Sequence, residues 1–274
     1  MIVTESNTEL KKICQRPDSF HRYISLPITR FFLTYTSMSP TQVTVLDFFI
    51  GLIGGMLLFI GKDWSFVAGT ILLQFFEVFD CVDGEVARYL MFKGKLKRTE
   101  SETRVVEFLQ DVVHPILQPL MYLGFCYGLY INYQQPILLI MGFIAAIGTS
   151  VDTHINILRE KLIGSTNAKD ASSLKKASRV YKEMKANAES MMKKIPFGKA
   201  LVEIVTFITP IPGVIAMLNI FTILDLLFFP NMKVIDINGF PINFKVTVLF
   251  FYAFLQQALW FMNARQSIIH LQKE

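Results

Sequence analysis

The strongest constraint on this chain is a run of ionisable residues inside a long apolar segment. Residues 65–92 have the length and composition of a helix that crosses a membrane, and the last third of this segment reads Asp80-Cys81-Val82-Asp83-Gly84-Glu85-Val86-Ala87-Arg88. Charged groups inside a bilayer are costly, so they are rare in spanning helices and usually have a function. The run therefore predicts a membrane-spanning helix that carries a functional site.

The composition of the whole chain agrees with a membrane protein. Hydrophobic residues make up 52% of the 274 positions and aromatic residues 13%, a larger apolar share than in an ordinary soluble domain of this length. The net charge of +5 comes from basic residues that lie between apolar runs instead of forming one face. We therefore expect the lipid bilayer, and no nucleic acid, as a partner. Cys14, Cys81 and Cys126 have no paired spacing, so neither a disulfide framework nor a zinc site is predicted.

Six apolar segments are long enough to cross a bilayer as helices. They cover residues 43–60, 65–92, 104–131, 136–151, 201–229 and 246–262. Residues 19–36 mix apolar side chains with Arg22 and Arg30, a pattern typical of an amphipathic helix in the membrane interface. The prediction is an all-α integral membrane protein, in which residues 1–38 form a cytoplasmic N-terminus with the interfacial helix and residues 39–274 form a six-helix transmembrane domain.

The distribution of Lys and Arg predicts the orientation in the membrane, because cytoplasmic segments carry the excess of positive charge. Residues 1–36, 93–104, 159–199 and the C-terminus contain 23 of the 27 Lys and Arg residues, whereas the loops on the opposite side contain 3. This multi-pass arrangement places both termini and the charged end of the second span on the cytoplasmic side. The Lys-rich residues 159–199 are expected to be a loop that is attracted to anionic lipid headgroups.

A second group of polar residues opens the third predicted span. At about 100° per residue, one face of that helix holds Glu107, Gln110, Asp111 and His114. In the second span the residues that share a face are Asp80, Asp83, Gly84 and Ala87. The two groups start from the same side of the membrane and lie at a comparable depth. Because hard divalent cations prefer carboxylate oxygens, two facing acidic stripes predict a metal site.

The pattern Asp80-x-x-Asp83-Gly84-x-x-Ala87-Arg88 resembles the first half of the signature of the CDP-alcohol phosphotransferases, a family of membrane enzymes. Their signature reads D-x2-D-G-x2-A-R and continues, after a spacer, with G-x3-D-x3-D; the first half matches here at every fixed position. The residues Pro40-Thr41-Gln42-Val43-Thr44 are also similar to the P-N-x-V-T sequence that is common at the start of the family's first span. The resemblance implies transfer of a substituted phosphate group from a CDP-alcohol, such as CDP-diacylglycerol, to an acceptor alcohol with release of CMP, in phospholipid or related glycolipid synthesis.

The resemblance also implies a role for each residue of the site. The CDP moiety is expected to contact Gly84, Ala87 and Arg88, and the Arg88 guanidinium suits a pyrophosphate because it can bind two oxygens at once. Two Mg²⁺ or Mn²⁺ ions are expected to bind at Asp80, Asp83, Glu107 and Asp111. Members of the family are commonly homodimers, so a homodimer is implied as well.

The second half of the signature departs from the family pattern, and two registers stay open. Thr103 stands where the Gly would be if Glu107 and Asp111 were the two acids. In this register, which we favour, Glu107 is a metal ligand and Asp111 is the general base that deprotonates the acceptor hydroxyl. In the other register Gln110 and His114 take these positions, and His114 is the catalytic base.

Two other classes of function stay open for the same residues. A non-catalytic relative that binds a CDP-alcohol or a metal is consistent with the missing Gly and the altered acids. An ion-coupled transporter would also carry carboxylates inside the membrane, but the spans show no repeat and the acids lie toward one side. Asp152 and His154, near the end of the fourth span, are interpreted as polar groups of the membrane interface.

Overall fold

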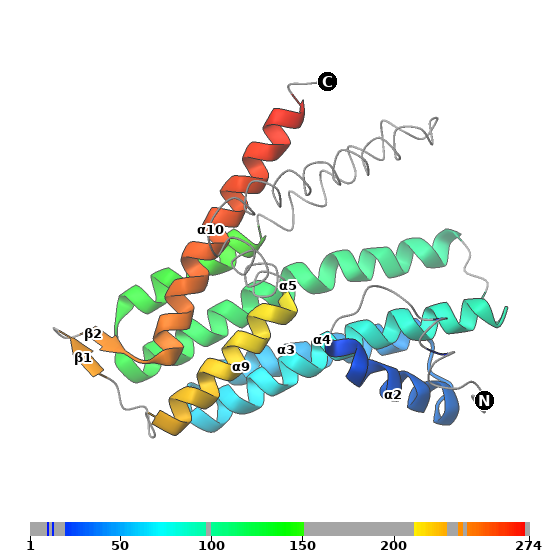
Figure 1. Ribbon diagram of the computed structural model, residues 1–274, viewed down its shortest axis with the longest axis horizontal. Coiled ribbons are helices and arrows are strands. Elements are labelled where there is room, and N and C mark those ends of the chain that lie inside the picture. The colour runs from blue at the N-terminus through cyan, green and yellow to red at the C-terminus, as the bar shows by residue number, and fades with distance from the viewer. Residues whose placement is uncertain are drawn as a thin grey trace, which may run out of the picture.

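The computed structural model describes residues 20–96, 100–150, 211–228, 235–237 and 240–271, together with Leu10 and Ile13. Its labelled helices are α2 (Phe20–Tyr35), α3 (Pro40–Leu58), α4 (Asp63–Phe92), α5 (Glu100–Tyr133), α9 (Ile211–Phe228) and α10 (Phe244–Leu271). A further helix, Pro136–Ser150, follows α5. Figure 1 shows how these helices are arranged along the chain.

Three of the described helices are long and apolar enough to cross a membrane. They are Pro40–Leu58, Asp63–Phe92 and Val112–Tyr133, the last within α5. Pro136–Ser150 and Val214–Phe228 are shorter apolar helices. The helical fold and the presence of helices of membrane-spanning length are thus confirmed, while the count of six spans stays a prediction. Residues 201–210, the start of the predicted fifth span, lie outside the described residues.

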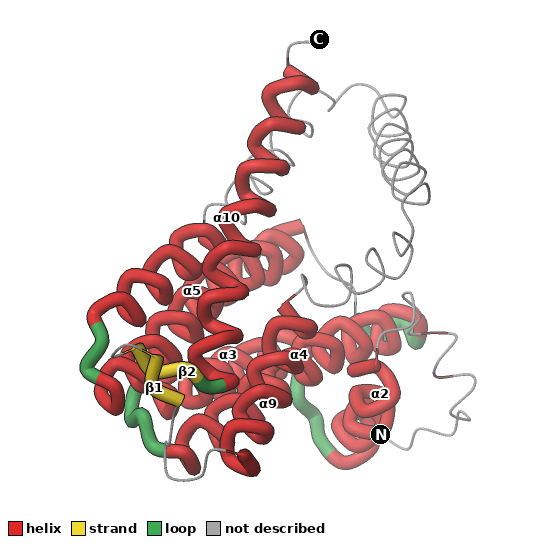
Figure 2. The backbone as a smooth tube through the Cα atoms, turned by 60° about the vertical axis from the view of Figure 1, so that its left-hand side comes forward, coloured by secondary structure: helices red, strands yellow, loops and turns green. Residues whose placement is uncertain are grey.

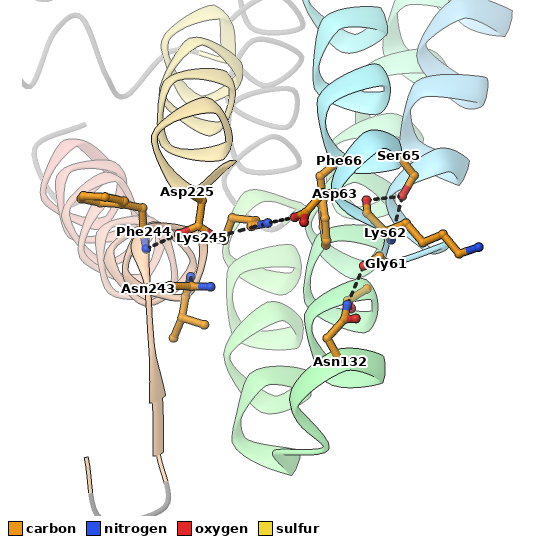
Figure 3. Close-up of polar contacts among 12 residues, drawn as sticks. Gly61, Lys62, Asp63, Ser65, Phe66, Asn132, Asp225, Asn243, Phe244 and Lys245 are labelled. Carbon is orange, nitrogen blue, oxygen red and sulfur yellow. Dashed lines mark hydrogen bonds and ion pairs between the residues drawn. The ribbon is translucent and has the colours of Figure 1, made fainter. Parts of the chain in front are cut away.

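The sequence provides α3 with a well-defined start and end. The backbone N–H of Gln42 donates to Ser39 Oγ at 3.3 Å and that of Ser39 donates to Gln42 Oε1 at 2.8 Å, which is a capping box, and Pro40 occupies the first turn. After α3 the chain turns at Gly61, whose φ of 75° favours glycine. The Asn132 side chain of α5 donates to the Gly61 carbonyl oxygen, so the turn is attached to α5 (Figure 3).

Glycines allow α3 to pack closely against both α4 and α5. A Cβ atom on Gly69 of α4 would lie 2.8 Å from the carbonyl oxygen of Gly54, and one on Gly124 of α5 would lie 2.7 Å from that of Gly55. Small residues at such positions let helix backbones approach each other in membranes. The three helices lie side by side as a result (Figure 1) and form one unit that brings their polar residues together.

Apolar packing borders this three-helix unit. On one side α2 contributes Phe32 and Leu33 to a buried cluster with Val82, Val86 and Tyr89 of α4. A larger buried cluster joins α5, the helix Pro136–Ser150, α9 and α10. In Figure 2, α10 continues beyond the other described helices toward the C-terminus.

A charged network links the start of α4 to α9 and α10. Lys245, which is 1% exposed, places Nζ 2.7 Å from Asp63 Oδ1 and 3.2 Å from Asp225 Oδ2. The backbone N–H of Phe244 donates to the other oxygen of Asp225 at 2.8 Å (Figure 3). We call Asp63, Asp225 and Lys245 the charged network. It holds the first residues of α4 and α10 together at the end opposite to the Asp80–Arg88 run.

A short hairpin precedes α10, within the loop expected between the fifth and sixth spans. Strand β1 (Ile235–Ile237) pairs antiparallel with β2 (Phe240–Ile242), and Ile235 lies opposite Ile242. Figure 2 shows the hairpin beside the start of α10. Strands of three residues are too short for a hydrophobic period to identify, so the sequence did not reveal this addition to the helical fold.

Candidate active site

Asp83 lies at the contact between α4 and α3. It is 4% exposed, and the Thr44 hydroxyl of α3 donates a 2.6 Å hydrogen bond to its Oδ2. Thr44 lies one turn after Pro40, the first residue of α3, and its hydroxyl is also 3.2 Å from the Pro40 carbonyl oxygen. The predicted metal ligand Asp83 therefore faces α3, with one carboxylate oxygen held in place.

Asp80 faces α5 and meets His114. The distance from Asp80 Oδ1 to His114 Nε2 is 3.4 Å, and both side chains are partly exposed, at 36% and 25% respectively. The His114 ring also packs edge-on against Phe76, with ring centroids 5.6 Å apart, while its buried Nδ1 has no hydrogen-bond partner among the described residues. The structure thus brings together two predicted site residues, Asp80 and His114.

Two acids that the sequence analysis did not select, Asp47 and Glu77, lie in the same part of the three-helix unit. Asp47 follows Thr44 by three residues on α3, and Glu77 precedes Asp80 by three residues on α4; both are buried. Asp47 interacts electrostatically with Asp80, Asp83 and Glu77. The same helical spacing that grouped Asp80 with Asp83 would have found both residues, had the contact between α3 and α4 been known.

We call Asp47, Glu77, Asp80 and Asp83 the acidic cluster. Its described partners are the Thr44 hydroxyl and the His114 ring, only one of which can carry a positive charge. Four carboxyl groups in apolar helices repel one another unless protons or cations are bound between them. The acidic cluster therefore carries repelling negative charges unless protons or cations are bound to it.

Arg88 borders the exposed side of this region. Its guanidinium folds back over Gly84, because a Cβ atom on Gly84 would lie 3.1 Å from Arg88 Nη1. Both residues are half-buried, whereas Ala87 is 4% exposed. Of the three residues predicted to hold the CDP moiety, Gly84 and Arg88 are thus the two with surface accessible to a ligand.

Glu85 points to a different helix from its neighbours in the run. The Ser25 hydroxyl donates to Oε1 at 2.9 Å and the Thr29 hydroxyl donates to Oε2 at 2.7 Å, and all three residues are buried. Both hydroxyls come from α2, which carries them one turn apart. Glu85 therefore attaches α2 to α4, and a carboxylate that sequence reasoning left unassigned has a clear structural partner.

The second half of the predicted site is described only in part. Glu107, Gln110 and Asp111 belong to α5, but their side chains lie outside the described residues, as do Asp152, His154 and residues 159–199. Within the described residues, no group of three or more His, Cys, Asp or Glu side chains could hold a metal ion. The choice between the two registers stays a prediction. The backbone does place Asp111 one turn before His114 on the same helix.

No family model matches this chain, and no curated protein matches it. In the part of the chain that the structure describes, the fold and the site define a helical protein with three helices of membrane-spanning length and a largely buried acidic cluster between them. Its function is therefore argued from these residues.

Proposed function

We propose that this protein transfers a substituted phosphate group from a CDP-alcohol to an acceptor alcohol and releases CMP. The observation that carries the proposal is the acidic cluster, in which the Asp80–Arg88 run meets α3 and α5 through Thr44 and His114. A run that matches the first half of the family signature at every fixed position would be expected to meet other polar groups if it forms a site. CDP-diacylglycerol is the donor we favour, because the cluster lies in helices of membrane-spanning length.

The side chains of the cluster suit a divalent cation. Glu77 Oε1 and Asp47 Oδ1 are buried oxygens without a hydrogen-bond partner among the described residues, and carboxylate oxygens are the ligands that Mg²⁺ and Mn²⁺ prefer. In the proposed enzyme Asp80, Asp83 and Glu107 are metal ligands. Asp111 is also a metal ligand, in addition to its role as the general base. Bound Mg²⁺ or Mn²⁺, two ions by the family resemblance, would screen the charge of the pyrophosphate.

Each residue of the proposed site has a task in the transfer. Arg88 binds the pyrophosphate, and Gly84 leaves room for its guanidinium. Asp111, in the register that we favour, takes the proton of the acceptor hydroxyl. The acceptor oxygen then bonds to the phosphorus that carries the donor alcohol, and the bond from that phosphorus to the bridging oxygen breaks. CMP leaves with that oxygen.

The proposal includes a membrane topology. We place six helices across the bilayer, α2 in the cytoplasmic interface, and both termini together with the acidic cluster on the cytoplasmic side. The support is the distribution of Lys and Arg, of which 23 of 27 lie in the segments on that side. Phospholipid or glycolipid synthesis and a homodimer follow from the family resemblance.

A measurement of CMP release tests the proposal. The full-length protein is reconstituted in lipid nanodiscs with Mg²⁺, CDP-diacylglycerol and a panel of alcohols, and the matched variants are Asp83→Asn and Asp63→Asn. Both substitutions remove one acid from α4, but Asp63 belongs to the charged network. We expect the wild type to release CMP, and we expect the same of Asp63→Asn at temperatures below the unfolding temperature of that variant. Asp83→Asn should release none. Equal rates for wild type and Asp83→Asn would contradict the proposal.

A non-catalytic relative that binds a CDP-alcohol is the second candidate. It is favoured by the protein partners that Asp80 and Asp83 already have, His114 and Thr44, and by Thr103 at the position of the family's glycine. Binding of a CDP-alcohol without CMP release from any acceptor would select this function.

A further inference from the structure

Two acids of the cluster, Asp47 and Glu77, are buried and have carboxylate oxygens without a described partner. Asp47 is 1% exposed and Glu77 is 5% exposed, and each has one carboxylate oxygen, Oδ1 and Oε1 respectively, with no hydrogen-bond partner among the described residues. A buried polar atom without a partner carries the full desolvation cost, which is largest for an ionised group. Such atoms therefore point to a missing partner.

The two acids lie further from the Gly94 end of α4 than the Asp83 carboxylate does. The Thr44–Asp83 bond fixes how α3 and α4, which run in opposite directions, lie against each other. One turn further along α3 comes Asp47, and two turns back along α4 from Asp83 comes Glu77. Both steps lead away from the Gly94 end of α4. Asp47 and Glu77 thus both lie on the inner side of the Thr44–Asp83 bond, and they interact electrostatically with each other.

The charged network shows how this protein treats a buried acid that has a structural task. Asp225 is as buried as Asp47, at 1% exposed, but Lys245 lies 3.2 Å away and neutralises it. No lysine or arginine forms a described ion pair with Asp47 or Glu77. The compensating charge at Asp47 and Glu77 must therefore come from outside the described side chains or from bound protons.

We propose that Asp47 and Glu77 bind a hard divalent cation, Mg²⁺ or Mn²⁺, between α3 and α4. Mg²⁺ is commonly held by one or two carboxylates, with water or phosphate oxygens as its other ligands, so two protein carboxylates are enough. The inference deepens the proposed function and rests on its divalent cations. It adds a carboxylate from α3, a helix to which neither register of the family signature assigns a ligand.

The test measures cation binding, and CMP release is not needed for it. Full-length protein in nanodiscs is titrated with Mn²⁺, and free Mn²⁺ is followed by electron paramagnetic resonance. We expect Asp47→Asn/Glu77→Gln to lose one equivalent of bound Mn²⁺ or to bind it about tenfold or more weakly, since loss of even an outer partner of a metal costs that much. In EDTA the same variant should melt at the same temperature as the wild type or higher, because repulsion within the cluster is relieved.

Two further variants make the result specific. Asp63→Asn, the control from the charged network, should bind Mn²⁺ like the wild type and melt at a lower temperature. Asp80→Asn/Asp83→Asn separates this inference from the proposed function. If this double variant abolishes Mn²⁺ binding while Asp47→Asn/Glu77→Gln leaves Mn²⁺ binding unchanged, the proposed function stands and the inference is wrong.

Wild-type stoichiometry and affinity in Asp47→Asn/Glu77→Gln would overturn the inference and assign bound protons to the two acids. If the double variant does not fold, each single variant is expected to weaken Mn²⁺ binding, and unchanged affinity in both would overturn the inference equally.

Discussion

The two ends of α4 carry acids in opposite electrostatic surroundings. At its first residue, Asp63 shares Lys245 with Asp225, and the backbone N–H of Phe244 satisfies the remaining oxygen of Asp225. In its last third, Asp80 and Asp83 lie with Asp47 and Glu77, and the described partners of these four are a hydroxyl and an imidazole. Among the described residues, α4 thus meets one set of acids that is paired with a lysine and one set that is not.

The presence or absence of a lysine partner separates acids that stabilise the fold from acids that need a ligand or a proton. A buried carboxylate paired with a lysine needs nothing further, and its loss harms folding. Buried carboxylates without such a partner destabilise the empty protein, so they persist where a ligand or a proton completes them. The comparison makes opposite predictions for substitutions at the two ends, in order of expected effect.

The largest effect is expected in the charged network. Lys245→Ala leaves Asp225 buried and unpaired, and we expect the free energy of unfolding to fall by about 3–5 kcal/mol. Unfolding in nanodiscs or detergent, followed by circular dichroism, measures it. The control is Lys245→Met/Asp225→Asn, which removes the buried charge but keeps an acceptor for the Phe244 N–H, and most of the lost stability should return. No recovery would mean that the lysine acts through its packing on Phe66.

At the other end of α4 the same kind of substitution should spare the fold and remove activity. Asp83→Asn keeps an oxygen that accepts from the Thr44 hydroxyl, so the unfolding temperature in EDTA should be unchanged or higher. CMP release should fall by about 100-fold or more, because a ligand of the cation is lost. A large loss of stability in this variant would place Asp83 with the structural acids and break the comparison.

The register of the second half of the site is decided by three variants. If Glu107 is a ligand and Asp111 the base, Glu107→Gln should raise the metal concentration needed for CMP release, whereas Asp111→Asn should lower turnover with metal binding largely intact. His114→Ala should then cost little activity. These outcomes are read from kcat at varied Mg²⁺.

The other register reverses this pattern. If His114 is the base, His114→Ala removes activity, and the rate should fall in acid because a protonated imidazole cannot accept the hydroxyl proton. Its pairing with Asp80 gives His114 a place at the site that suits this role as well. An enzyme indifferent to Glu107 and Asp111 but inactive without His114 would overturn the register that we favour.

A smaller effect is expected where α2 meets α4. Ser25→Ala and Thr29→Ala each remove a donor to the buried Glu85 carboxylate, and each should cost about 1–3 kcal/mol of stability. Thr36→Ala is the control, because its hydroxyl bonds to the Phe32 carbonyl oxygen of the same segment, and its cost should be about 0.5 kcal/mol or less. Equal costs in all three variants would show that Glu85 does not depend on α2.

Local signals in the sequence mark the start of α3 and the turn between α3 and α4. The Ser39–Gln42 capping box starts α3, and the turn at Gly61 separates α3 from α4. The apolar runs then set the helix lengths. The Asp80–Arg88 run was likewise predicted to be a functional site from its cost in an apolar helix.

The missing parts depend on contacts between helices, which no local pattern contains. The sequence analysis included Asp47 in an apolar run. Asp47 meets the other acids of the cluster because Gly54 and Gly69 let α3 pack closely against α4. Glu85 belongs to the run and yet faces Ser25 and Thr29 on α2, a direction that depends on where α2 packs. Sequence spacing tells which residues share a face, and the packing of glycines and apolar residues decides what that face meets.

The central claim is that the acidic cluster is a cation-dependent site for a CDP-alcohol. The most direct measurement is CMP release from CDP-diacylglycerol by the purified full-length protein, first in EDTA and then with Mg²⁺ or Mn²⁺ restored. We expect no release in EDTA, release with either ion and an acceptor alcohol, and no release by Asp83→Asn under any condition. Release that is equal with and without divalent cations, or that persists in Asp83→Asn, would contradict the account.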